Sequence, residues 1–136
     1  MKIIRPLLQE IYKDNPWQML VCCMLLNLTH RRQVDKIRSE LFYRWPTPEK
    51  MMEADQEELA KLLKPLGFYN KRAKSLVKMS KQWVYRHRCQ LKVSDLHGIG
   101  EYAMDSYNIF VMNKIPKSPD MVQDKVLKQY IREIKE

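Results

Sequence analysis

Glycine is scarce in this 136-residue chain, which has only Gly67, Gly98 and Gly100. Stretches in which β-branched and polar residues alternate are nearly absent as well, so a sheet-based fold is disfavoured. Leu, Met, Lys, Glu and Gln, which favour helices, are abundant instead. The sequence therefore predicts an all-α fold, and its length predicts a single compact helical domain over residues 1–136.

Cysteine and long apolar runs are also in short supply. Cys22, Cys23 and Cys89 have the spacing of neither a disulfide framework nor a metal site, and an adjacent pair inside an apolar stretch is typical of core packing. The most apolar stretch, residues 19–28, has about half of the ~20 residues that a bilayer-spanning helix needs. Its place and flanks also differ from those of a signal peptide. We expect an intracellular protein that is not secreted, with no metal or other cofactor and no segment that spans a membrane.

Acidic residues are outnumbered by basic ones. There are 16 Asp and Glu against 25 Lys and Arg, which gives a formal net charge of +9. Such an excess favours a polyanionic partner, because each Lys or Arg beside a phosphate releases condensed counterions. Nucleic acid is the partner that this balance indicates first. An anionic membrane surface and an ordinary solvated basic surface remain as alternatives.

Apolar periodicity, prolines and capping residues divide the chain into helices. Helices are predicted over residues 3–13, 16–27, 31–44, 69–86, 101–113 and 122–134. A short helix begins at Pro48 behind Thr47 as its cap, and another begins at Asp55 and stops at residues 64–67. Residues 86–90 form a polar linker, and no internal repeat is found.

The most informative stretch is Leu96-His97-Gly98-Ile99-Gly100, in which two glycines flank one apolar residue between predicted helices. Glycine allows a tight turn and close approach of another backbone, so the amide groups of this turn and of the next helix N-terminus can point at a phosphate. A dinucleotide-binding fold would need a strand before the glycines, and none is predicted here. The pattern therefore indicates a helix-hairpin-helix motif that contacts a phosphate backbone, with Ile99 packed in the core.

Several sequence blocks follow one another in a familiar order. They are residues 15–17, 25–27, 62–67, 71–74 and 96–100, followed by Tyr102, residues 105–107 and residues 109–110. Through these blocks the chain resembles the helix-hairpin-helix (HhH-GPD) superfamily of DNA glycosylases, which includes endonuclease III, and in particular the thymine glycosylases that carry a methyl-CpG-binding domain. The resemblance extends over residues 15–130. It implies base excision repair on double-stranded DNA, base flipping, a monomer, and a location in the nucleus or cytoplasm with access to DNA.

The resemblance implies that Asp124 is the catalytic residue. The family has one aspartate at the start of the helix after the hairpin unit, with Leu and Tyr three and six positions later, as Leu127 and Tyr130 are here. A carboxylate there is favoured by the helix dipole and can stabilise oxocarbenium charge or orient water. Asp124 as a mere helix cap, and Asp120 as a rival cap or catalyst, stay open. Lys125 replaces the usual histidine, and the connector before Asp124 is slightly longer than in the family.

Two further residues are assigned to the base pocket by the resemblance. Tyr102 stands two residues after Gly100, where bifunctional relatives carry a lysine that forms a Schiff base. A phenol is no amine nucleophile, so lyase activity is not expected, and Tyr102 could stack on or hydrogen-bond an extruded pyrimidine. Gln9 corresponds to a pocket glutamine that could read a pyrimidine edge. Its alternative role is that of a plain surface helix residue.

The loop Leu66-Gly67-Phe68 corresponds to the family loop that inserts an apolar wedge into the duplex. Phe68 is the wedge by this comparison, since an aromatic side chain can replace lost stacking, and packing of Phe68 in the core is the alternative. Leu28 stands where the family has an arginine that contacts the distorted DNA backbone. The loss of this charge suggests a different opposite-base preference or weaker DNA binding.

The remaining predicted DNA contacts are glycines and basic residues. They are Lys71, Arg72 and Lys125, together with His97, Gly98, Ile99 and Gly100 of the hairpin and Leu66 and Gly67 of the wedge loop. For Lys71, Arg72 and the nearby Lys74, a solvated helix face is an equally good explanation. His30 and His97 lack metal-ligand spacing, and no four-cysteine cluster for an iron–sulfur site follows the last helix.

We therefore expect a monofunctional DNA glycosylase, a hydrolase that excises a T- or U-type pyrimidine. Two other hypotheses keep the fold. In one, the protein modifies a flipped 5-substituted pyrimidine without excising it, which the replaced histidine and the longer connector motivate. In the other, it is a DNA lesion-binding module without catalysis. The hairpin glycines fit all three hypotheses.

Overall fold

The computed structural model describes residues 2–136, and in this range the chain consists of helices joined by turns, with no strand. The α-helices are α1 (Leu8–Ile11), α2 (Pro16–Leu26), α3 (Arg31–Arg44), α4 (Pro48–Met52), α5 (Gln56–Leu63), α6 (Tyr69–Tyr85), α7 (Glu101–Phe110) and α8 (Lys125–Lys135). Three short 3-10 helices lie between them: η1 (Lys64–Leu66), η2 (Val93–Asp95) and η3 (Pro119–Met121). The predicted all-α fold class is confirmed.

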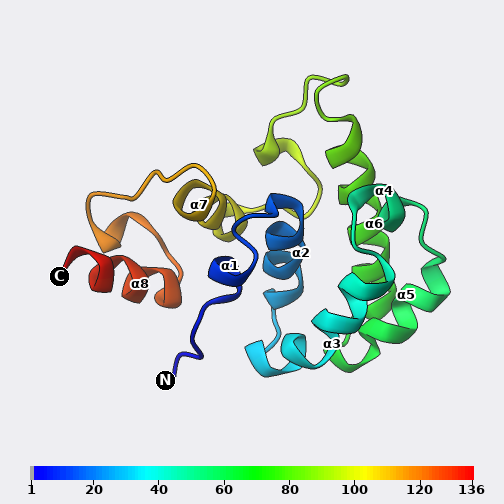
Figure 1. Cartoon of the computed structure of the whole chain (residues 1–136), viewed down its shortest axis with the longest axis horizontal. Coiled ribbons are helices and arrows are strands. Elements are labelled where there is room, and N and C mark those ends of the chain that lie inside the picture. Colours follow the sequence, from blue (N-terminus) through cyan, green and yellow to red (C-terminus); the bar gives the residue numbers. More distant parts are fainter. Residues whose placement is uncertain (1) are drawn as a thin grey trace.

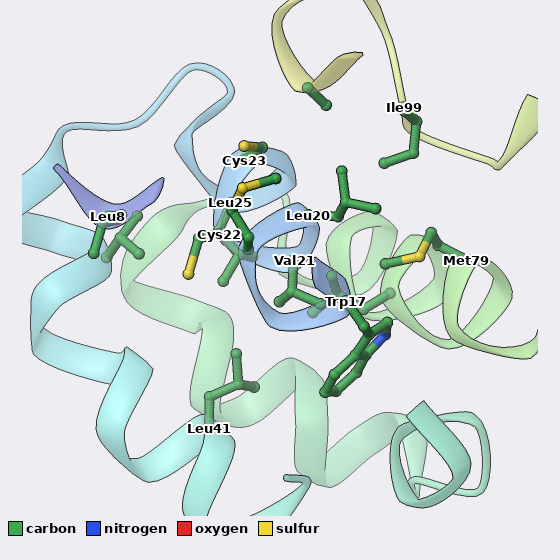
Figure 2. Packing of buried hydrophobic residues seen from close by; sticks show 14 of the residues in the cluster. Leu8, Trp17, Leu20, Val21, Cys22, Cys23, Leu25, Leu41, Met79 and Ile99 are labelled. Atoms are coloured by element: carbon green, nitrogen blue, oxygen red, sulfur yellow. The ribbon is translucent and has the colours of Figure 1, made fainter. Parts of the chain in front are cut away.

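Helix α2 occupies the centre of the molecule (Figure 1). It is apolar on nearly all sides, so it must be surrounded by other elements, and it packs against α1, α3, α6 and α7. Figure 2 shows its side chains Trp17, Leu20 and Val21 among core residues of other helices, such as Leu41 and Met79. The Trp17 indole N–H, buried in this core, donates a hydrogen bond of 3.0 Å to the hydroxyl of Ser80 on α6.

The other helices lie on two sides of α2. In Figure 1, α3 to α6 form one side, where α4 and α5 pack along α6, and α7 and α8 form the other. The hairpin that precedes α7 and the loop that precedes α6 both reach back toward α2. Asn27, which follows α2, lines a cavity with Gln9 and Asp124 and another with Phe68 and Gly100. The two sides also share one continuous apolar core, which runs from α1 to α8.

Local signals placed most of the helices correctly. Residues 31–44 are helical as predicted, and the predicted cap Thr47 accepts a hydrogen bond from the first turn of α4. Asp55, where the next helix was predicted to begin, is the N-cap of α5. The prediction of a helix over residues 3–13 was wrong, because only Leu8–Ile11 is helical. Pro6 explains the difference, since a proline disfavours helical backbone in the residue before it and lacks an amide donor.

The last two helices are shorter than predicted. Helix α7 ends at Phe110 and not at residue 113, because the chain turns at Asn113, which has a positive φ of 55°. Helix α8 begins at Lys125 and not at residue 122, because the Asp124 side chain caps it by accepting from the Leu127 amide. Within the described residues, no helix is long and apolar enough to span a bilayer.

Candidate functional site

A buried hydrogen-bond cluster joins α1 to α7. Gln9 is only 3% exposed, and its Nε2 donates to the Tyr102 hydroxyl oxygen at 2.7 Å and to Ser106 Oγ at 3.1 Å. Both protons of the amide nitrogen are thereby used, and the carbonyl Oε1 remains available to accept. Gln9 is therefore a core residue of α1, and its alternative role as a surface residue is excluded. Ser106 was not predicted, because its partner lies 97 residues away.

Gln9, Tyr102 and Asp124 line one cavity of about 420 Å³. Its other walls are mainly apolar and come from the N-terminal segment, the end of α2 and the start of α8: Ile3, Ile4, Leu7, Leu8, Leu26, Leu28 and Val126. A space of this size and lining accepts a small planar molecule, with a few polar groups to orient it. The three residues that the sequence comparison assigned to catalysis and to the base pocket thus meet at one place.

Asp124 is both a helix cap and part of the cavity wall. Its Oδ2 accepts a hydrogen bond of 3.0 Å from the Leu127 amide, as expected for an N-cap, and the side chain is half-buried. The second carboxylate oxygen is left for a ligand. Asp120 lies in η3, is exposed and lines neither this cavity nor the one beside it. The geometry therefore favours Asp124 over Asp120 as the reactive group.

The environment of Tyr102 keeps its phenol neutral. Burial, together with the nearby Cys23 and Asp124, raises the pKa of Tyr102 well above its usual value, and the hydrogen bond from Gln9 opposes this only in part. Burial likewise raises the pKa of Cys23 to about 12, so this thiol is not a nucleophile at neutral pH. Neither side chain offers nucleophilic chemistry to a ligand.

The turn at residues 97–100 has the geometry that its glycines suggested. Gly98 has a φ of 78°, and a Cβ built on it would lie 2.7 Å from the Met24 methyl carbon. Ile99 is buried, as predicted. Among residues 2–136, the exposed amides of Gly98 and Gly100 donate no hydrogen bond, and α7 begins directly after them. Free amides of this kind at a helix N-terminus are suited to binding an anion.

His97 fixes this turn to α6. Its backbone amide donates to Gln82 Oε1 at 2.6 Å, and its Nε2 lies at hydrogen-bonding distance, 3.1 Å, from Ser75 Oγ. Burial, with a smaller contribution from the positive charge of Lys78, lowers the pKa of His97, so the ring is neutral at pH 7. Within residues 2–136, no three His, Cys, Asp or Glu side chains are grouped in a way that could hold a metal ion.

A second cavity of about 460 Å³ lies between this turn and the loop before α6. Tyr102 lines both cavities, as do Asn27 and Leu28. Phe68 lines the second cavity and is 66% exposed, with a left-handed backbone (φ 47°), so it does not pack in the core. Its neighbour Leu66 is buried and Gly67 has a φ of 73°. Leu28, which faces the same cavity, is 82% exposed.

The three basic residues that were predicted to contact DNA have different surroundings. Lys71 is exposed at the rim of the second cavity, beside Phe68. Arg72 lines the same cavity, but its guanidinium is bound to backbone carbonyls of the protein. Lys125 lies apart from both cavities, in an open surface groove with Lys128 and Arg132 of α8. The structure thus brings Lys71 to the hairpin and wedge loop but not Lys125.

The chain matches the model of a known family over most of its length. Residues 21–135 match the HhH-GPD superfamily of base excision DNA repair proteins. A methyl-CpG-binding domain protein 4-like protein of Arabidopsis thaliana is 40% identical over 104 residues, which is 76% of this chain and 23% of the plant protein. A thymine-DNA glycosylase of Aeropyrum pernix is 33% identical over 65% of this chain and 42% of its own length.

Solved structures agree with the fold. A thermostable thymine-DNA glycosylase superposes with a TM-score of 0.67 over 79% of this chain and 58% of its own, at 20% identity. Endonuclease III, in a trapped covalent intermediate with DNA, superposes with a TM-score of 0.64 over 87% of this chain and 63% of its own, at 17% identity. The chain spans less than half the length of the two curated relatives above.

Proposed function

Because the chain belongs to the HhH-GPD superfamily of base excision DNA repair proteins, we propose that it is a monofunctional DNA glycosylase. It acts as a monomer on duplex DNA, takes up an extruded T- or U-type pyrimidine and hydrolyses its N-glycosidic bond. The observation that carries the proposal is the meeting of Gln9, Tyr102 and Asp124 at one cavity, next to exposed amides suited to a phosphate.

The polar groups of the cavity favour a base with an imide N–H. Both Nε2 protons of Gln9 are bound to Tyr102 and Ser106, so Gln9 presents the acceptor Oε1 to a ligand. Thymine and uracil carry a donor at N3, whereas cytosine carries an acceptor there. An acceptor held by two hydrogen bonds discriminates strongly, because a mismatched polar group would stay unpaired. The apolar walls suit a substituent at C5.

Asp124 assists the bond cleavage. Asp124 lines the same cavity as Gln9, at the N-terminus of α8, and one of its carboxylate oxygens is not used by the cap. As the glycosidic bond breaks, the base leaves with the bonding electron pair and positive charge develops on the deoxyribose, which a nearby carboxylate stabilises. Water then adds to the C1′ carbon and loses a proton, which leaves a free base and an abasic site.

No Schiff-base chemistry is expected at Tyr102. A phenol cannot form an imine with the C1′ aldehyde of an abasic site, and burial raises the pKa of this phenol further. Tyr102 instead lines both the cavity of Gln9 and the cavity of Phe68. It can therefore contact the base inside the first cavity while the duplex occupies the second. The enzyme then stops at the abasic site without cutting the strand.

The DNA-facing surface consists of the second cavity and its rim. The amides of Gly98 and Gly100 and the N-terminus of α7 bind a phosphate, and Lys71 lines the same cavity. Phe68 projects from the rim and fills the gap that the extruded base leaves in the stack. The net charge of +9 supplies the general attraction to the duplex.

The test is incubation with duplex oligonucleotides that carry T:G, U:G, 5-hydroxymethyluracil:G or normal pairs. Both strands are then analysed by intact mass, with and without alkali. Release of a free base, with strand breaks only after alkali, is the expected result. Breaks without alkali would indicate a lyase. A heavier base with no abasic site would indicate a modifying enzyme, and binding without any change would leave a lesion-binding module.

A further inference from the structure

Arg72, in the first turn of α6, holds two separate loops through one guanidinium group. Its Nε donates a hydrogen bond of 2.8 Å to the carbonyl oxygen of Gly67, and its Nη2 donates one of 2.9 Å to the carbonyl oxygen of Asn27. These carbonyls belong to the loop before α6 (residues 66–68, the Phe68 loop) and to the loop after α2 (residues 27–30, the Leu28 loop). The side chain is half-buried between them.

The two loops expose apolar side chains on the same cavity. Phe68 and Leu28 are 66% and 82% exposed, and both have left-handed backbones, with φ values of 47° and 59°. Such a backbone is unfavourable for residues other than glycine and persists only where surrounding contacts enforce it. Both side chains are largely exposed, so their own packing contributes little to this. The hydrogen bonds of Arg72 supply contacts of this kind to both loops at once.

A phosphate contact, as the sequence suggested for Arg72, fits this geometry poorly. The Nε and Nη2 donors point at protein carbonyls, so the planar group cannot offer that side to a phosphate in the usual paired manner. Lys71, which precedes it, is exposed and free to contact DNA. We propose that Arg72 is a positioning residue that fixes the Phe68 and Leu28 loops as one rigid edge, against which the duplex is unstacked. The role in unstacking rests on the proposed function.

The first test concerns the free protein. Arg72→Lys keeps the charge but lacks the two-pronged donor geometry, and Lys71→Gln is the matched control on the same helix turn. Backbone ¹⁵N relaxation is measured for the amides of Leu28 and Phe68 in each variant. We expect the order parameters of both loops to fall in Arg72→Lys and to stay unchanged in Lys71→Gln. Unchanged order in both loops of a folded Arg72→Lys protein would overturn the proposal.

The second test separates positioning from charge in DNA binding. Arg72→Gln and Lys71→Gln are titrated with a T:G duplex that carries 2-aminopurine beside the mismatch, at several salt concentrations. A lost phosphate contact lowers the slope of log K against log salt by about 0.9. We expect that reduction for Lys71→Gln only, and a loss of the fluorescence gain on unstacking for Arg72→Gln only. The reverse pattern would make Arg72 a phosphate contact.

A third measurement needs no variant, in case the substitutions unfold the protein. Hydrogen exchange of the Arg72 Nε–H group is followed by NMR in the wild-type chain, with the exposed Arg88 as reference. A hydrogen bond to Gly67 makes exchange at Arg72 markedly slower than exchange at Arg88, and equal rates would refute the proposal that Arg72 holds the two loops. None of these readouts requires base excision. Absence of activity would therefore count against the proposed function without deciding the role of Arg72.

Discussion

Replacement of Asp124 by asparagine separates the cap that the structure shows from the catalytic role that we propose for this residue. As a cap, the side chain accepts one hydrogen bond, from the Leu127 amide to Oδ2 at 3.0 Å. Asparagine can accept the same bond and ranks with aspartate as an N-cap. As the catalyst, the residue needs its negative charge. Asp124→Asn therefore keeps the cap and removes the catalyst.

The expected magnitudes differ greatly between the two roles. Loss of the charge at the N-terminus of α8 costs about 0.3–1 kcal/mol of folding stability, the size of a helix-dipole interaction. Asp124→Ala also loses the hydrogen bond, which costs about 1 kcal/mol, typical for a cap. The excision rate, in contrast, falls by about 10²–10³ in both variants, as for removal of one group that stabilises charge in a transition state.

The assay is single-turnover excision with protein in excess over a T:G or U:G duplex, beside chemical denaturation of each variant. Asp120→Asn is the matched control, because Asp120 is exposed and lines neither cavity. We expect the control to match the wild type in both measurements. Full activity of Asp124→Asn would reduce Asp124 to a cap, and loss of activity in Asp120→Asn would move the catalytic role there.

Three other substitutions test the site in different ways. Phe68→Ala should change the free energy of unfolding by less than about 0.5 kcal/mol, because the side chain is exposed. The same substitution should slow excision from paired DNA more than excision from a single strand, and equal slowing would argue against a wedge. Gly98→Ala should lose about 1–2 kcal/mol in denaturation because of its φ of 78°, whereas Gly100→Ala, with no heavy atom within 4 Å of the added carbon, should be nearly neutral. Burial and neighbouring carboxylates raise the pKa of Asp105 above 3.8, so the folded state binds this proton more tightly than the unfolded chain does. Asp105→Asn should therefore raise the thermal midpoint at pH 7, with no gain below pH 3.8, and a gain that persists in acid would contradict the cause given.

Local features of the fold could be predicted from the sequence, because they depend on residues a few positions apart. The caps Thr47 and Asp55 bind amides two or three residues later, and the bounds of α3 follow from its periodicity. The hairpin of residues 96–100 could also be predicted, because it depends on the backbone of two glycines that are close in the sequence. The predicted helix bounds were wrong at some helix ends, because Pro6 and the cap at Asp124 make the helices begin later than the apolar pattern predicted.

The candidate site could be predicted only as a set of residues. The assignments of Gln9, Tyr102 and Asp124 came from resemblance, and the residues lie together as that required. Their orientation could not be derived from the chain order, because the Gln9 amide is set by Ser106, 97 residues away. Arg72 illustrates the opposite case. Its basic character predicted a phosphate contact, but backbone carbonyls, which no sequence pattern reveals, engage its guanidinium.

The shortness of α1 links the stability of the N-terminal segment to the candidate pocket. A helix of four residues, Leu8–Ile11, cannot form on its own, since even good helix formers need about 12–15 residues in water. Burial of Leu8 and the two hydrogen bonds of Gln9 to α7 are what hold it in place. The same contacts fix the acceptor that would read the base. A ligand that binds to Gln9 Oε1 therefore stabilises the docked segment, and DNA with an extruded pyrimidine should slow hydrogen exchange in residues 7–12 more than it slows exchange in α5.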